Sequence, residues 1–178
     1  MRLFFFGSLM DADLLRLVLD RDAADIDHAP AEILGYERRR AKDESFPIIV
    51  PTPGGRVEGR LVTGLTAEDV ARIQWYESDD YALRPCVVKA GEMRHDAYVF
   101  QATASLEAEG IAWEFEHWVA VEKPMCLSLA QEIMSHYGAI SSTELVARWP
   151  EMKARALAQH FGEPVALPVR RRAGGRRR

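Results

Sequence analysis

The chain has 178 residues, enough for one domain with a full hydrophobic core, or for one domain with an extension. Its 48% hydrophobic and 28% charged residues are typical of an ordinary globular protein. The two cysteines, Cys86 and Cys126, are too few and too far apart to indicate a disulfide or metal framework. We expect both to be core thiols in a reducing compartment.

The formal charge of -4 conceals an uneven distribution of charge. Six of the 23 basic residues are arginines within residues 170–178. Residues 1–169 therefore contain 17 basic and 27 acidic residues, and their net charge is -10. An acidic body is a poor surface for nucleic acid. We expect the Arg-rich tail, residues 164–178, to be disordered and solvated. Whether its arginines contact RNA or another acidic surface stays open.

Residues 3–6 form a continuous apolar run, which predicts a strand buried on both faces. Gly7-Ser8 then turns the chain into an amphipathic helix over residues 11–19. The backbone N–H groups of such a turn could hold a carboxylate or a phosphate, although many such turns bind nothing. Acidic residues follow the short apolar run at once, unlike a signal peptide. No stretch approaches the roughly 20 apolar residues of a membrane span, so we expect a cytoplasmic protein without membrane contact.

The following residues predict closely spaced strands interrupted by only two helices. Strands are expected over 31–41, 46–50 and 56–65, with a turn at 51–55, and in a hairpin of 85–89 and 95–101 around Gly91-Glu92. This pattern favours an α+β fold with a small, mostly antiparallel β-barrel and flanking helices. Residues 1–111 would form the barrel and residues 112–163 a helical extension packed on it. In the extension we expect Ser142-Thr143 to cap one short helix and Pro150 to start another.

The residue that draws most attention is Glu77, at the end of a helix predicted over residues 66–76. Thr66 and Asp69 can form a capping box at the start of this helix. Val70, Ile73 and Glu77 share one helical stripe, which should face the core. Burial and the negative helix end would raise the pKa of such a carboxyl group towards the range useful for proton transfer. The alternative is a Glu77 that lies just past the helix end and points into water.

Three short motifs occur in one order along the chain. They are Phe6-Gly7-Ser8-Leu9, then Pro51-Thr52-Pro53-Gly54-Gly55-Arg56-Val57-Glu58-Gly59, and then Tyr76-Glu77 followed by Tyr81 and Arg84. In this order the set resembles the γ-glutamylcyclotransferase-like family, also called the AIG2-like family, and the match covers about residues 1–118. The resemblance implies a small β-barrel with flanking helices that releases 5-oxoproline from γ-glutamyl compounds, without a metal or a cofactor.

The resemblance also implies roles for single residues. Glu77 would be the general acid/base, which accepts a proton from the substrate's α-amino group and gives one to the leaving amine. Tyr81 and Arg84 would line the pocket or brace Glu77, and residues Phe6, Gly7, Ser8 and Leu9 would form the loop against the substrate.

The sequence departs from the family pattern at three places. Phe6 replaces the usual Tyr, and Ser78 replaces the Gly that usually follows the Glu. The segment between Tyr81 and Arg84 is one residue longer than in the family pattern, which affects where Arg84 is placed. The identity of the substrate is therefore left open.

The sequence gives weaker support for a serine nucleophile, a cysteine nucleophile or a metal site. Ser8 lacks the second glycine of a nucleophile elbow. Cys86 lies within a predicted strand, and the five histidines lack metal-ligand spacing. Two functions of different class stay open: an enzyme acting on a γ-glutamyl amide or γ-glutamylamine, by cyclisation or by hydrolysis, and a non-catalytic module that binds a small acidic metabolite or a protein partner.

Overall fold

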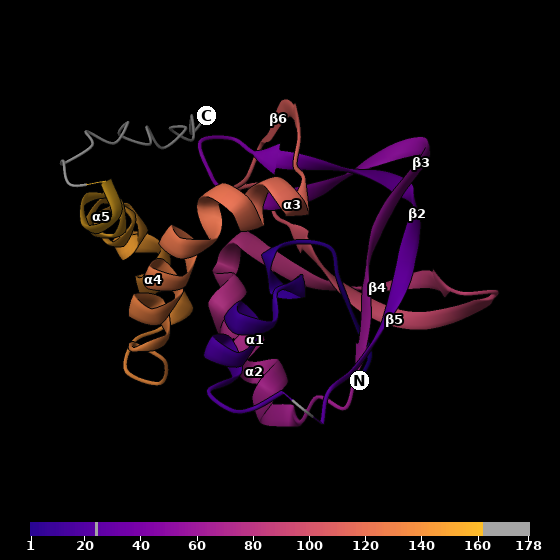
Figure 1. Ribbon diagram of the computed structural model, residues 1–178, viewed down its shortest axis with the longest axis horizontal. Helices are drawn as coiled ribbons and strands as arrows, with labels where there is room; N and C mark the ends of the chain where they lie inside the picture. Colours follow the sequence, from indigo (N-terminus) through magenta and orange to yellow (C-terminus); the bar gives the residue numbers. More distant parts are fainter. Residues whose placement is uncertain (24, 162–178) are drawn as a thin grey trace, which may run out of the picture.

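The computed structural model describes residues 1–23 and 25–161, and these residues form a five-stranded barrel with helices on one side (Figure 1). The strands are β1 (Leu3–Phe5), β2 (Asp27–Ala41), β3 (Pro47–Thr63), β4 (Tyr81–Ala90), β5 (Met93–Ala102) and β6 (Ala108–Ala112). The helices are α1 (Ala12–Leu19), α2 (Ala67–Glu77), α3 (Phe115–His117), α4 (Lys123–Met134) and α5 (Ser142–Phe161), with short turns η1 (Ser8–Met10), η2 (Ser78–Asp80) and η3 (Trp118–Glu122).

The barrel closes because β3 pairs with both β1 and β2. The strand order is β3-β1-β5-β4-β2, with β6 added to β2 outside the ring. The pairing of β1 with β5 is parallel, and the other pairings are antiparallel. The expected α+β fold with a mostly antiparallel barrel is therefore confirmed.

The first strand explains why its apolar run is continuous. Successive side chains of a strand point to opposite faces. Phe4 and Phe6 pack inside the barrel, whereas Leu3 and Phe5 pack against the helices. All four are buried, so the prediction of a strand buried on both faces is confirmed.

Two predictions about regular elements are wrong. The expected turn at residues 51–55 does not reverse the chain, because the strands on either side of it are one long β3 that pairs with β2 throughout. A shift of register between Leu34 and Tyr36 accommodates the extra residues as a bulge. The two short helices expected after residue 141 are likewise one helix, α5, with Pro150 inside it.

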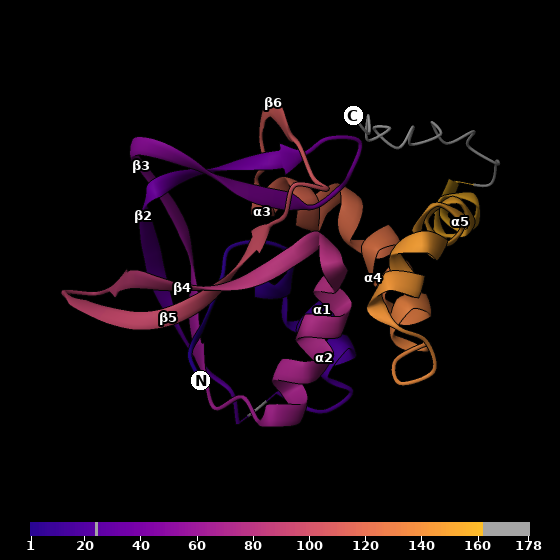
Figure 2. The same cartoon turned by 180° about the vertical axis from the view of Figure 1, so that it is seen from behind.

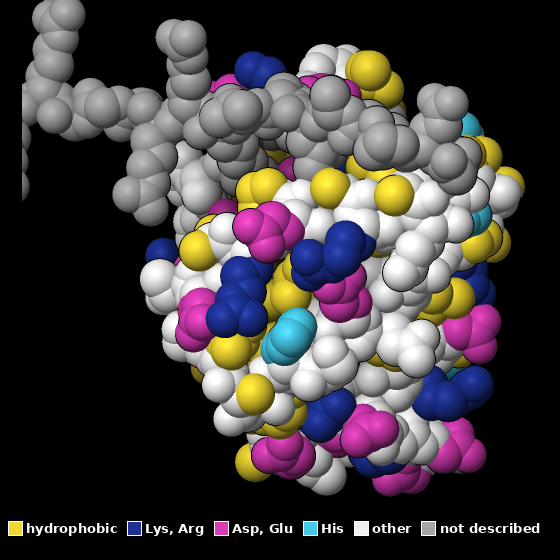
Figure 3. All heavy atoms as spheres, turned by 90° about the vertical axis from the view of Figure 1, so that its left-hand side faces the viewer, with side chains coloured by type: hydrophobic (Ala, Val, Ile, Leu, Met, Phe, Trp, Pro, Cys, Tyr) yellow, Lys and Arg dark blue, Asp and Glu magenta, His cyan; other side chains and the backbone are white. Residues whose placement is uncertain are grey.

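The helical extension shares a hydrophobic core with the barrel. Trp113 and Trp118 are buried in the same cluster as Leu3 and Phe5 of β1. Seen from both sides, α1 and α2 lie next to the barrel, α4 lies beyond them, and α5 is outermost (Figures 1 and 2). Charged side chains of both signs are mixed on the surface seen from the α4–α5 side (Figure 3). The predicted Arg-rich tail, 164–178, lies outside the described residues. Among those that are described, no helix is long and apolar enough to cross a membrane.

Candidate active site

Helix α2 carries Glu77 to the site, and its start is held firmly. The Thr66 hydroxyl accepts from the Asp69 N–H at 3.1 Å, and the Asp69 carboxylate accepts from the Thr66 N–H at 2.8 Å. This capping box confirms the sequence prediction. Asp69 is itself buried and pairs with both nitrogens of the Arg21 fork, at 2.9 and 2.7 Å. The hydrogen bonds from Arg21 lower the pKa of Asp69 to about 2.

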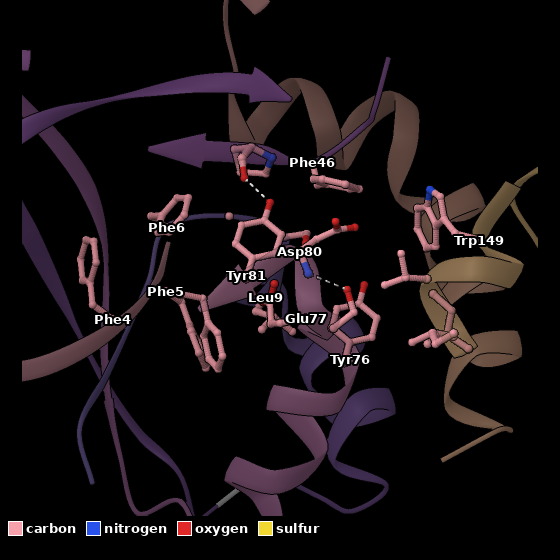
Figure 4. Close-up of a pocket in the computed structure, with 18 residues that line it drawn as sticks. Phe4, Phe5, Phe6, Leu9, Phe46, Tyr76, Glu77, Asp80, Tyr81 and Trp149 are labelled. Carbon is pink, nitrogen blue, oxygen red and sulfur yellow. Dashed lines mark hydrogen bonds between the residues drawn. The ribbon is translucent and has the colours of Figure 1, made fainter. Parts of the chain in front are cut away.

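Glu77 is the last residue of α2, and its side chain faces a pocket rather than bulk water. Figure 4 shows Glu77 near Leu9 and Tyr81, between Phe4, Phe5 and Phe6 on one side and Trp149 on the other. The pocket holds about 90 Å³, compared with the roughly 10–15 Å³ that one water needs. It therefore has room for part of a small molecule.

Burial raises the pKa of Glu77 to about 8. Burial removes water from the carboxylate and so favours the neutral acid. Among the described residues, no hydrogen bond to the Glu77 carboxyl group offsets this cost. The neighbouring Asp79 does not face Glu77, because its two oxygens accept from the Ser142 and Thr143 hydroxyls at 2.8 Å each. A carboxyl group that titrates near neutral pH can both accept and donate a proton.

The residues that connect β1 to α1, hereafter loop 6–9, line the same pocket as Glu77. The Gly7 and Ser8 carbonyls accept from the Met10 and Asp11 N–H groups at 3.0 and 2.9 Å. In such a turn the first N–H groups have no partner within the turn itself. A Cβ atom on Gly7 would lie 2.8 Å from Cγ of Pro47, so only glycine fits there without a shift of the proline.

Tyr81 joins loop 6–9 and Glu77 in the pocket, and Arg84 does not. The Tyr81 hydroxyl donates to the Pro47 carbonyl at 2.8 Å, so it braces the segment packed against Gly7. Arg84 is exposed on β4, paired opposite Val99, and is not among the lining residues. Three positions separate it from Tyr81, and an odd separation turns a strand residue to the other face of the sheet. The extra residue in this segment therefore takes Arg84 away from the site.

Ser78 sits in a backbone conformation that is usual for glycine. Its φ is 58° and its ψ is -166°, a region that costs other residues on the order of 1–3 kcal/mol. Ser78 stands where the resemblance expects glycine, and its backbone conformation is one that glycine adopts without this cost.

Sequence reasoning missed the α5 side of the pocket. We call Leu145, Val146 and Trp149 the α5 wall, because all three line the cavity and come from this one helix. The Trp149 and Phe46 rings meet edge to face with centroids 6.1 Å apart. Nothing in the sequence indicated which part of the molecule this helix would contact.

Arg38 was also missed, since it reads as the polar end of a strand. Its guanidinium donates to the Phe6 carbonyl at 2.9 Å and to the Trp113 carbonyl at 3.0 Å. It also lies over the Trp113 ring, 5.1 Å from the centroid. Arg38 thereby ties loop 6–9 to the segment that precedes α3.

A carboxyl group with a raised pKa, in a largely apolar pocket that a glycine turn also lines, defines a class of small barrel proteins suited to proton transfer. No group of three or more His, Cys, Asp or Glu side chains is placed to hold a metal ion in the described part of the chain. The chain belongs to the family described as "Gamma-glutamyl cyclotransferase, AIG2-like", whose model matches residues 3–120.

Known proteins support this membership. "AIG2-like protein A" of Arabidopsis thaliana is 27% identical over 139 residues, which are 74% of this chain and 79% of the relative. A solution structure from Arabidopsis thaliana, 19% identical, matches with a TM-score of 0.55 over 96% of this chain and 93% of that one, so the shared fold extends into the C-terminal helices. A structure named gamma-glutamyl cyclotransferase is 14% identical and matches with a TM-score of 0.50 over 61% of this chain and 69% of that one.

Proposed function

We propose that this protein releases 5-oxoproline from a γ-glutamyl amide or γ-glutamylamine, with Glu77 as the general acid/base. The observation that carries the proposal is the position of Glu77, in the pocket that loop 6–9 also lines, with its pKa raised to about 8 by burial. A group with that pKa can exchange a proton with an amine at physiological pH.

The reaction needs one proton to move twice. The substrate's α-amino nitrogen attacks its own γ-carbonyl carbon, forming the ring C–N bond, and gives a proton to the Glu77 carboxylate. The bond from the γ-carbon to the leaving nitrogen then breaks, and protonated Glu77 returns the proton to that nitrogen. Glu77 thus ends as it began, and the products are 5-oxoproline and an amine. An incoming α-ammonium group would favour the ionised form of Glu77, and it must release its extra proton to solvent before the neutral amine attacks.

Loop 6–9 would position the reacting end of the substrate. Its first N–H groups, which have no partner within the turn, are suited to the α-carboxylate or to the negative charge that develops on the γ-carbonyl oxygen. Holding the amine and the carbonyl in contact would favour ring closure. Tyr81 would act as a positioning residue, because its hydroxyl holds the Pro47 carbonyl, and the Pro47 ring packs against Gly7. The small-molecule substrate and the cytoplasmic location stay predictions.

The test is release of 5-oxoproline from a panel of γ-glutamylamines, γ-glutamyl amino acids and glutathione. Glu77→Gln removes the titrating group at nearly constant volume, so we expect turnover to fall by at least roughly 10³-fold with the fold intact. Glu92→Gln is the matched control, because Glu92 is exposed in the β4–β5 turn. Full activity of Glu77→Gln would show that the acid/base role is wrongly assigned.

The reaction products distinguish cyclisation from hydrolysis and from binding without turnover. Free glutamate in place of 5-oxoproline would indicate hydrolysis at the same site. Saturable binding of an acidic metabolite or of a protein partner, without turnover of any substrate, would favour the non-catalytic module.

A further inference from the structure

The pocket has two chemically different ends. Loop 6–9 and Glu77 supply the polar groups at one end. The other end, on the side of α4 and α5, is formed by apolar and aromatic side chains, as Figure 4 shows for Phe46 and Trp149. The residues at this second end are Phe46, Ile133, Leu145, Val146 and Trp149.

The described residues of the pocket also include no cationic side chain that could pair with a carboxylate on the leaving group. None of the described residues that line it is Lys, Arg or His, and its ionisable carboxyl groups are Glu77 and Asp80. Arg38 and Lys153, which contact lining residues or their partners, have hydrogen-bond partners of their own. Lys153 donates to the Glu44 carboxylate at 2.8 Å, and Arg38 donates to the Phe6 and Trp113 carbonyls. A carboxylate placed at the apolar end would lose water without gaining a counter-charge.

The α5 wall is a fixed part of the site. Asp79, two residues after Glu77, accepts from the Ser142 and Thr143 hydroxyls at the start of α5. One turn beyond the wall, Lys153 is held by Glu44, and the Trp149 indole N–H donates to the other Glu44 oxygen at 3.3 Å. The helix is therefore tied at both ends of the stretch that faces the pocket.

Resting on the function proposed above, we infer that the α5 wall binds the leaving amine, and that the preferred substrates are γ-glutamylamines with an apolar or aromatic amine and no carboxylate on it. If the γ-glutamyl group occupies the end near loop 6–9 and Glu77, the scissile bond directs the amine towards the α5 wall. Apolar surface at that end favours an alkyl or aryl group, and the missing cation disfavours an amino acid.

A matched pair of substrates tests this. γ-Glutamyl-phenethylamine and γ-glutamyl-phenylalanine have the same ring and the same amide, and differ only in the carboxylate of the leaving group. We expect kcat/KM for 5-oxoproline release by the full chain to be at least about tenfold higher for the amine. The amine with a cationic end, γ-glutamyl-agmatine, should fall below γ-glutamyl-phenethylamine as well.

A positive charge added to the wall should weaken the preference. Val146→Lys places an ammonium group at a half-buried position of the α5 wall, and we expect it to lower the ratio of the two kcat/KM values by roughly tenfold. Ala147→Lys is the control, because Ala147 is the next residue of α5 but is exposed and does not line the pocket. It should leave the ratio unchanged.

The outcomes are distinguishable. 5-Oxoproline released equally well from both compounds, or better from γ-glutamyl-phenylalanine or γ-glutamyl-agmatine, would overturn the inference and leave the proposed function standing. An equal change of the ratio in Val146→Lys and Ala147→Lys would also overturn it. Failure of every γ-glutamyl compound to yield 5-oxoproline would overturn the proposed function, and the inference with it.

Discussion

Loop 6–9 and the α5 wall line the same cavity, but they are held in different ways. The loop is held by contacts to its backbone, and the wall is held by contacts between side chains. In the loop, Gly7 leaves room for Pro47, and Arg38 holds the Phe6 carbonyl. In the wall, Asp79 and Glu44 hold α5 by hydrogen bonds and an ion pair, and Trp149 packs on Phe46. A backbone site constrains the reacting group, whereas a side-chain wall can vary with the rest of the substrate. We therefore expect damage to the loop to impair turnover of every substrate and damage to the wall to act selectively.

The largest effect in this comparison is expected from Gly7→Ala. The new methyl group would meet Pro47 at 2.8 Å, and the displaced segment carries the carbonyl that accepts from Tyr81. Overpacking of this kind costs about 1–3 kcal/mol, and we expect kcat to fall at least roughly tenfold on all substrates. Gly110→Ala is the control, since a Cβ there meets nothing within 4 Å. Equal activity of Gly7→Ala and Gly110→Ala would contradict the role of loop 6–9.

A smaller and more selective effect is expected from Trp149→Ala. The change removes the ring that packs on Phe46 and opens the α5 side of the pocket. We expect a loss of about 2 kcal/mol in the free energy of unfolding, since the ring is only partly buried. KM for γ-glutamyl-phenethylamine should rise roughly fivefold, with kcat less affected. Trp149→Phe keeps an aromatic ring and should restore most of the affinity. An effect on kcat alone would place Trp149 on the reacting side instead.

The smallest effect is expected from Ser78→Gly, and it has the opposite sign. Ser78 holds a glycine-type conformation at φ 58°, so glycine removes the steric cost. We expect the protein to gain about 1 kcal/mol in the free energy of unfolding, with activity unchanged. Denaturant titration of the variant measures this gain. Asp43 also has a positive φ, of 63°, but lies away from the pocket, and Asp43→Gly provides a comparison for strain outside the site. A loss of stability in Ser78→Gly would mean that the serine makes contacts that outweigh its strain.

The parts of the site that are encoded locally could be predicted from the sequence. The capping box at Thr66 and Asp69, the stripe that turns Glu77 towards the pocket, and the glycine turn after β1 each depend on residues close together in the chain. Arg84 was expected at the pocket, but it lies on the other face of β4. A shift of one residue along a strand moves a side chain to the opposite face, and the motif alone does not fix that register.

The α5 wall could not be predicted, because its position depends on distant partners. Asp79 lies more than sixty residues before Ser142, and Glu44 lies more than one hundred before Trp149. Neither pair carries a local sequence signal. The bulge in β3 was missed for a similar reason, since Pro51 and Gly55 are typical of a turn, and only the pairing with β2 keeps the chain extended.

The pKa of Glu77 is the quantity on which the account depends, and it also sets the pH dependence of stability. Its folded value of about 8 exceeds its ordinary value of 4.5, so stability falls as pH rises between these two values, while the unfolded chain is ionised and the folded one is not. We expect Glu77→Gln to match the parent protein in the free energy of unfolding at pH 4 and to exceed it by up to about 5 kcal/mol at pH 9.

The most direct test is a carbon-13 NMR titration of the Glu77 carboxyl group in the full chain, with Glu77→Gln used to assign its signal. We expect the titration midpoint at a pH of about 8, with the carboxyl group protonated at pH 6. A midpoint near 4.5 would contradict it, because Glu77 would then be solvated and too weak a base for the proposed proton transfer.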